Sequence, residues 1–73
     1  MMTEQQAAAV NPFYAGSYAG HPCYTVDAAD RIRKARDFTA EQCRAALALP
    51  GLQKGVVTAL NRRLGLLKRQ GRA

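Results

Sequence analysis

The segment of residues 39–69 constrains the fold more than any other, because it marks where two successive helices begin and end. Thr39 and Gln42 have the spacing of a capping box, in which each side chain bonds to the backbone N–H of the other residue. An apolar run follows, and Pro50-Gly51 ends it, because proline lacks an amide hydrogen and glycine tolerates positive φ. The segment therefore predicts two helices joined by a tight turn.

The residues that follow this turn show the period of an amphipathic helix. Apolar side chains recur along the segment and would form one face: Leu52, Val56, Val57, Leu60, Leu64 and Leu67. The other face would be polar and basic: Lys54, Thr58, Asn61, Arg62, Lys68 and Arg69. We expect one helix over residues 39–49 and a longer, basic helix over residues 52–68.

A further helix is expected ahead of this pair, over residues 27–37. Thr25 or Asp27 can cap it, and a carboxylate from Asp30 in the first turn suits the helix dipole. A basic run covers much of its surface: Arg31, Arg33, Lys34 and Arg36. The expected core of the three helices, with alanines between, is Ile32, Phe38, Leu47, Leu49, Leu52, Val56, Val57, Leu60, Leu64 and Leu67.

Residues 1–24 are expected to form a flexible or loop-like arm ahead of a helical domain of residues 25–73. Residues 13–24, FYAGSYAGHPCY, contain most of the aromatic residues of the chain. They have too much glycine for a helix and too few aliphatic residues for a core strand, so we expect a loop or a loose hairpin. The predicted class is all-α: a small three-helix, helix-turn-helix-like domain with an irregular aromatic N-terminal arm.

The aromatic side chains of this arm admit three interpretations. They can pack over the helices as a lid, or they can contact a partner, because tyrosine gives much contact area at a low cost in entropy. Base stacking is the third interpretation. No basic residue lies among the rings, which makes base stacking the weakest of the three.

Charge is divided sharply along the chain. Residues 1–30 carry three acidic residues and no basic one, whereas residues 31–73 carry all eleven basic residues and two acidic ones. A half-chain this basic suits a polyanion or an acidic patch on another protein. It argues against a mimic of DNA, which needs the opposite sign.

The sequence gives no support for an enzyme, a metal or a cofactor. His21 and Cys23 could supply two metal ligands, but tetrahedral zinc takes four, and only Cys43 could be added to them. A nucleophilic Cys23 with His21 as base lacks an orienting third group. No apolar run approaches the roughly 20 residues that span a bilayer, and residues 1–10 lack the basic start of a secretory signal. We expect a cytoplasmic protein with reduced thiols and no small-molecule substrate.

Residues 39–70 resemble the two DNA-reading helices of winged-helix and helix-turn-helix regulators. Residues 57–62, VTALNR, are similar to a recognition helix, and residues 64–71 are similar to the strand that begins a wing. The resemblance implies that Gln53, Lys54, Thr58 and Asn61 face a groove of the DNA. It implies that Arg62, Arg63, Lys68 and Arg69 face the phosphates.

The whole chain resembles the small, basic transcription regulators of lytic Xanthomonas bacteriophages, in its size, its helical layout and its tyrosine-bearing arm. The resemblance implies binding to the host RNA polymerase, at the N-terminal part of the β′ subunit near the RNA exit channel. It further implies inhibition of σ-dependent initiation and readthrough of terminators, that is, antitermination.

The favoured hypothesis is therefore a transcription regulator that docks on bacterial RNA polymerase. Four aromatic and four basic residues would contact the protein partner: Phe13, Tyr14, Tyr18, Tyr24, Arg31, Arg33, Lys34 and Arg36. The basic face of the last helix, with Arg63, would lie beside nascent RNA or DNA. Two alternatives stay open: a helix-turn-helix DNA-binding regulator, and a phage or plasmid inhibitor of another host protein.

Overall fold

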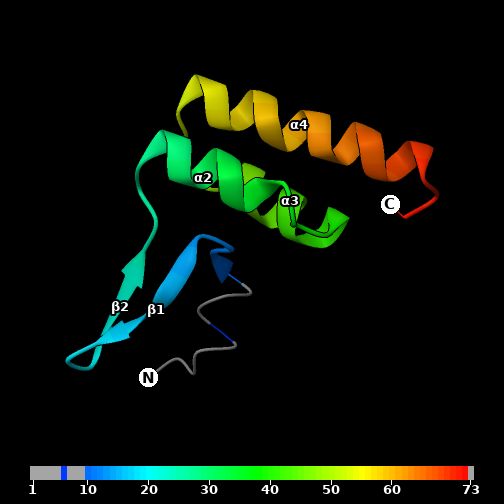
Figure 1. Ribbon diagram of the computed structural model, residues 1–73. Coiled ribbons are helices and arrows are strands. Elements are labelled where there is room, and N and C mark those ends of the chain that lie inside the picture. The colour runs from blue at the N-terminus through cyan, green and yellow to red at the C-terminus, as the bar shows by residue number, and fades with distance from the viewer. Residues whose placement is uncertain (1–5, 7–9, 73) are drawn as a thin grey trace.

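The computed structural model describes residue 6 and residues 10–72 (Figure 1). Its labelled elements are β1 (Tyr14–Tyr18), β2 (His21–Tyr24), α2 (Ala28–Ala35), α3 (Ala40–Leu47) and α4 (Lys54–Arg69). The predicted all-α class is wrong, because β1 and β2 pair as an antiparallel sheet ahead of the helices. The fold is mixed α/β. Most of residues 1–10 of the predicted arm lie outside the described residues.

The hairpin forms because its two-residue turn matches the twist of the strands. Ala19 and Gly20 both have positive φ, at 53° and 80°, between the paired residues Tyr18 and His21. Positive φ at both positions is the mark of a type I′ turn, whose twist suits a tight hairpin. Alanine is an unusual residue at the first of these positions, so residues 18–21 lack the asparagine-glycine pattern that usually marks a tight hairpin turn.

The register of the hairpin slips by one residue near its base, because β1 holds an extra residue between Tyr14 and Gly16. Gly16 adopts a φ of 111° there. A bulge of this kind bends a strand and increases its twist. Beside it, the rings of Tyr14 and Tyr24 meet edge to face, with centroids 5.7 Å apart. This cross-strand aromatic pair stabilises the hairpin in the absence of aliphatic residues.

Phe13 anchors the hairpin in the helical core. Its side chain is fully buried, and its ring centroid lies 5.4 Å from that of Phe38. The Thr25 backbone N–H donates to the Phe13 carbonyl at 2.8 Å, which closes the hairpin at its base. Phe13 was predicted to contact a partner, and this assignment is corrected: the residue precedes β1 and points into the core.

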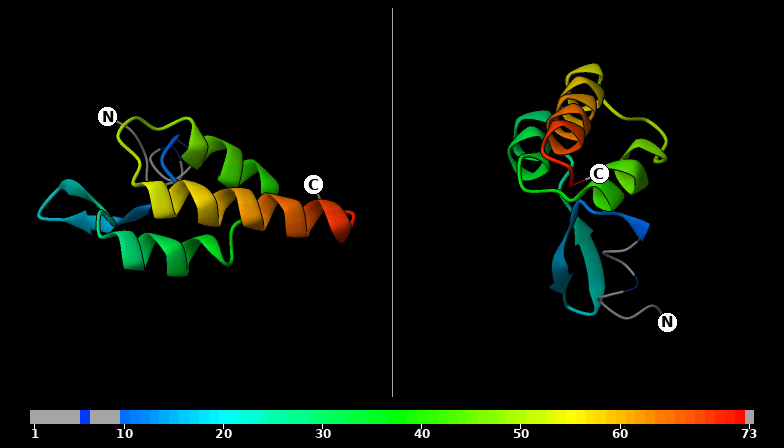
Figure 2. Two further views of the ribbon diagram at one scale, coloured as in Figure 1. Left: turned by 90° about the horizontal axis from the view of Figure 1, so that it is seen from above. Right: turned by 90° about the vertical axis from the view of Figure 1, so that its right-hand side faces the viewer.

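α2, α3 and α4 pack in alternating directions. α4 packs against both α2 and α3. α2 and α4 run side by side in the same direction, whereas α3 runs the opposite way (Figures 1 and 2). The connection through residues 48–53 is longer than the roughly three- to four-residue turn of a helix-turn-helix motif, whose helices cross steeply. α3 and α4 therefore form a helical hairpin.

The predicted starts of α2 and α3 are confirmed, α4 begins at Lys54 where residue 52 was predicted, and the strand implied for residues 64–71 is wrong. The Asp27 carboxylate accepts from the Asp30 backbone N–H at 3.2 Å, and Thr39 and Gln42 form the complete capping box. α4 continues to Arg69 without a break. Residues 64–71 therefore do not form the strand that would begin a wing, because the apolar spacing of α4 keeps this stretch helical against the core.

Small side chains let the helices approach one another closely. The fully or nearly fully buried residues are Phe13, Ala35, Phe38, Ala40, Cys43, Ala46, Val56, Leu60 and Leu67. Other predicted core residues are partly buried around them: Ile32, Leu47, Leu49, Leu52 and Leu64. The predicted core is therefore correct in its helical part except for Val57, which is half-buried and lies outside this cluster. It lacked Phe13.

The hairpin projects from the helical part, so the molecule is elongated, with principal extents of 41 × 23 × 18 Å. The tip of the hairpin and the C-terminal end of α4 lie at opposite ends of the long direction (Figure 2). The predicted boundary between arm and helical domain falls at the end of β2. Among the described residues, no helix has the length and apolar character needed to cross a membrane.

Candidate binding surfaces

Arg31, predicted to contact a partner, instead ties three parts of the molecule together. Its Nε–H donates to the Thr25 carbonyl at 2.7 Å, and a terminal nitrogen donates to Oε1 of Gln53 at 2.9 Å. Its guanidinium carbon lies 4.9 Å from the centroid of the Phe13 ring, within the range of a cation–π contact. Gln53 in turn donates through Nε2 to the Val26 carbonyl at 2.9 Å. We call this arrangement the Arg31 clasp.

The other three basic residues of the run on α2 differ in what they contact. Lys34 donates through Nζ to the Tyr14 carbonyl at 2.9 Å, so its charge also holds the hairpin. Arg33 is exposed and forms an ion pair with Asp30 one turn earlier. Arg36 is exposed at the end of α2. Of the four basic residues predicted to bind a protein, Arg33 and Arg36 point to solvent, whereas Arg31 and Lys34 act within the fold.

The hairpin exposes aromatic surface at its tip. Tyr18 is 77% exposed, the largest exposure among the large apolar side chains of the described residues. Tyr14 and Tyr24 are half-buried against each other, and the Tyr14 hydroxyl lies 2.7 Å from Oγ of Ser17. These three tyrosines, without Phe13, are the aromatic residues that a partner could reach.

One face of α4 carries the predicted polar and basic side chains. Thr58, Asn61, Arg62, Gly65 and Arg69 line a shallow depression along the helix, which we call the α4 outer face. Thr58 donates its hydroxyl proton to the carbonyl one turn earlier, at 3.2 Å. Lys54 and Lys68 are also exposed, at the first and last turns of α4.

Arg63 does not lie on the α4 outer face with the other predicted phosphate-binding residues. Its side chain turns toward the connection between α2 and α3, where its Nε–H donates to the Phe38 carbonyl at 2.9 Å. Phe38 lies in the connection between α2 and α3, so the bond satisfies a backbone acceptor that no helix pairs. Arg63 therefore has a structural bond that its sequence position did not reveal.

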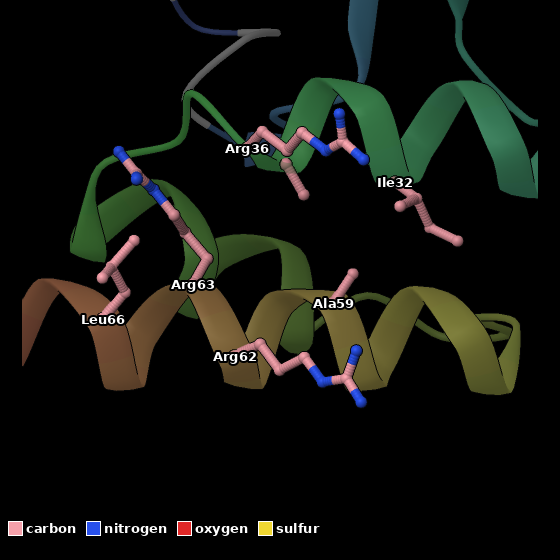
Figure 3. Close-up of a pocket in the computed structure, with 7 residues that line it drawn as sticks. Ile32, Arg36, Ala59, Arg62, Arg63 and Leu66 are labelled. Carbon is pink, nitrogen blue, oxygen red and sulfur yellow. The ribbon is translucent and has the colours of Figure 1, made fainter.

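A groove that the sequence did not predict lies between α2 and α4, and we call it the α2–α4 groove (Figure 3). Its volume is about 350 Å³, and it is lined by Ile32, Ala35, Arg36, Ala59, Arg62, Arg63 and Leu66. Leu66 is 37% exposed there. The feature of the sequence that could have indicated this groove is Leu66. It lies next to the apolar face of α4 and extends that face toward α2.

The α4 outer face and the α2–α4 groove share a positive electrostatic environment. α4 carries five basic residues and, throughout its described length, no acidic one. Its first turn lacks the carboxylates that would offset its dipole, and its last turn holds Lys68 and Arg69. Clustered cations on one helix attract anionic partners and accelerate their association at low salt.

The cysteines differ in environment. Cys43 is fully buried in α3, and burial raises the pKa of its thiol, although the nearby Arg63 and Arg44 act in the opposite direction. Cys23 is exposed on β2, next but one to His21. Within the described part of the chain, no three His, Cys, Asp or Glu residues lie together in a way that could hold a metal ion. The two cysteines are both free thiols.

Comparison of the chain with protein-family models, with curated proteins and with solved structures gives no significant match.

Proposed function

We propose that this chain is a binding protein that regulates transcription by docking on bacterial RNA polymerase. In this proposal it acts in the bacterial cytoplasm on the β′ subunit near the RNA exit channel. There it inhibits σ-dependent initiation and promotes antitermination. Such a role needs two surfaces: one that binds protein, and one that can lie beside nucleic acid without repelling it.

The observation that carries the proposal is the joining of two unlike surfaces on one body. The hairpin projects from the helices with Tyr18 at its tip, and aromatic side chains of this kind are frequent anchors of protein interfaces. The α4 outer face is basic and faces solvent. The Arg31 clasp fixes the first surface relative to the second.

This arrangement supports a division of labour between the two surfaces. Tyr14, Tyr18 and Tyr24 would contact the polymerase, and the exposed Arg33 and Arg36 of the basic run on α2 would contribute further contacts. The α4 outer face would then lie along RNA or DNA emerging from the enzyme, with cations that contact phosphates without reading sequence.

A retention assay with purified polymerase tests the proposal. Immobilised chain is mixed with core enzyme, with holoenzyme and with isolated β′, and the retained protein is measured. Tyr18→Ala should weaken retention about tenfold or more, the usual loss at an aromatic anchor. Val26→Ala removes another exposed apolar side chain near the hairpin base and serves as the control. If neither β′ nor holoenzyme is retained, the proposal is wrong.

A second candidate, direct DNA binding, is favoured by one observation. Asn61, Arg62 and Arg69 line the same depression on the α4 outer face, where a DNA groove could receive them. A gel shift against random duplexes tests this alternative at about 50 mM salt. Binding that is lost in Asn61→Ala and that falls steeply with salt would support it. No shift at this salt would exclude it.

A further inference from the structure

We propose that the α2–α4 groove is a docking site for an acidic protein segment that inserts one large apolar side chain. The groove lies apart from the hairpin tip, and no sequence motif or resemblance assigned it a role. The proposal does not depend on RNA polymerase being the partner, because it follows from the chemistry of the groove alone.

The floor of the groove is aliphatic. Ile32 on α2 and Ala59 on α4 face each other across it, and Leu66 closes one end (Figure 3). A volume of about 350 Å³ lies at the lower end of the range for pockets that bind small ligands. It is large enough for one leucine, methionine or phenylalanine side chain. The small side chain of Ala59 is what leaves this space open.

The rim of the groove is cationic. Arg36 comes from the end of α2 and Arg62 from α4, while Arg63, also from α4, lines the groove with its Nε–H bonded to the Phe38 carbonyl. No carboxylate lines the groove among the described residues. Guanidinium groups bind carboxylates through paired hydrogen bonds. Because they are more weakly hydrated than ammonium groups, they lose less hydration free energy on binding. The charge complement of this rim is therefore a segment with carboxylates on both sides of its apolar residue.

The floor favours a protein segment over a nucleic acid. Bases are held on proteins by stacking on aromatic rings, and no aromatic residue lines the groove. An aliphatic floor with an arginine rim instead matches the central pocket and polar border of a protein interface. The α4 outer face, which shares only Arg62 with the groove, carries the polar side chains suited to nucleic acid.

The probe for this site is a short fluorescein-labelled peptide with one phenylalanine flanked on each side by glutamates. Its binding to the full chain is measured by fluorescence polarisation at low and at physiological salt. Two matched peptides separate the contributions: one replaces phenylalanine by alanine, and the other replaces the glutamates by glutamines. Each change should weaken binding about tenfold or more.

Variants of the chain locate the peptide. Ala59→Phe fills the groove without changing charge, and Arg36→Glu reverses one rim charge without touching the α4 outer face. Both should weaken binding about tenfold or more. Arg44→Glu changes the net charge by the same amount at an exposed position of α3 and should leave binding within about twofold of the original. If circular dichroism shows that Ala59→Phe is unfolded, Ala59→Leu takes its place.

Several results would overturn the inference. They are equal binding of the glutamate and glutamine peptides, an equal loss in Arg44→Glu and Arg36→Glu, and binding that Ala59→Phe leaves intact. Preferential binding of a labelled single-stranded RNA with the same dependence on Arg36 and Ala59 would also overturn it. Peptide binding without polymerase retention would leave the groove assigned and refute the proposed function, whereas the reverse result would refute only the groove.

Discussion

Two glycines in open surroundings give opposite predictions for the same substitution. Gly65 lies inside α4 with helical backbone, and Gly51 lies in the connection from α3 to α4 with a φ of +71°. A Cβ added at either position would meet nothing within 4 Å. Substitution by alanine therefore changes only the match between residue and backbone conformation, not the packing.

The expected magnitudes follow from this difference. Gly65→Ala should raise the free energy of unfolding by roughly 0.5–1 kcal/mol, the penalty of glycine relative to alanine inside a helix. Gly51→Ala should lower it by roughly 1–2 kcal/mol, the penalty of an L-residue in the left-handed region. One kcal/mol shifts the melting temperature of a domain this small by about 4–8 °C. The two variants should therefore melt on opposite sides of the parent chain.

The measurement is thermal and urea unfolding followed by the helical circular dichroism signal. The two variants have the same composition, mass and charge, so each is a control for the other. Urea midpoints should move with the melting temperatures while the slopes stay equal, because the surface exposed on unfolding does not change. A shift of both variants in the same direction would refute the assignment of backbone conformation at one of these glycines.

Further predictions concern the core, the caps, the hairpin and the buried thiol. Phe13→Ala should lower the free energy of unfolding by about 3–5 kcal/mol in urea titrations, because it empties the centre of the core. Ala19→Asn should raise it by up to about 1 kcal/mol, since asparagine accepts the left-handed region that the turn requires. Thr39→Ala should lower it by about 1 kcal/mol in the same titrations, through loss of the α3 cap. The raised pKa of Cys43 means that the unfolded chain loses the thiol proton first as pH rises. Stability, measured at a series of pH values, should therefore hold below the ordinary pKa of the thiol and fall above it, and Cys43→Ala should remove this fall.

The helical part of the fold could be predicted from sequence because its signals are local. The capping box at Thr39 and the spacing from Val56 to Leu67 each depend on residues a few positions apart. The arm was expected to be a loop or a loose hairpin, and its regular strand pairing and tight turn could not be predicted, because Ala19 is not a residue that marks such a turn. The burial of Phe13 depends on its contact with Phe38, far along the chain, which no local pattern encodes.

The candidate surfaces were predictable only as far as solvent exposure follows from helical periodicity. The spacing of Thr58, Asn61 and Arg62 placed them correctly on one face of α4. Arg31 and Arg63 were indistinguishable from solvated cations in the sequence, because their acceptors lie outside their own helices: the Thr25 carbonyl and the Gln53 side chain for Arg31, and the Phe38 carbonyl for Arg63. The α2–α4 groove depends on how two helices pack side by side, and the sequence of neither helix specifies it alone.

The Arg31 clasp has a mechanical consequence for any complex that this protein forms. Arg31 and Gln53 join the root of the hairpin to the first turn of α4, so the root is braced on two sides. The hairpin and the helices are therefore expected to move together when a partner binds Tyr18. A partner that binds only the hairpin thereby also fixes the orientation of α4. The direction in which the basic face of α4 points is then set by that one contact.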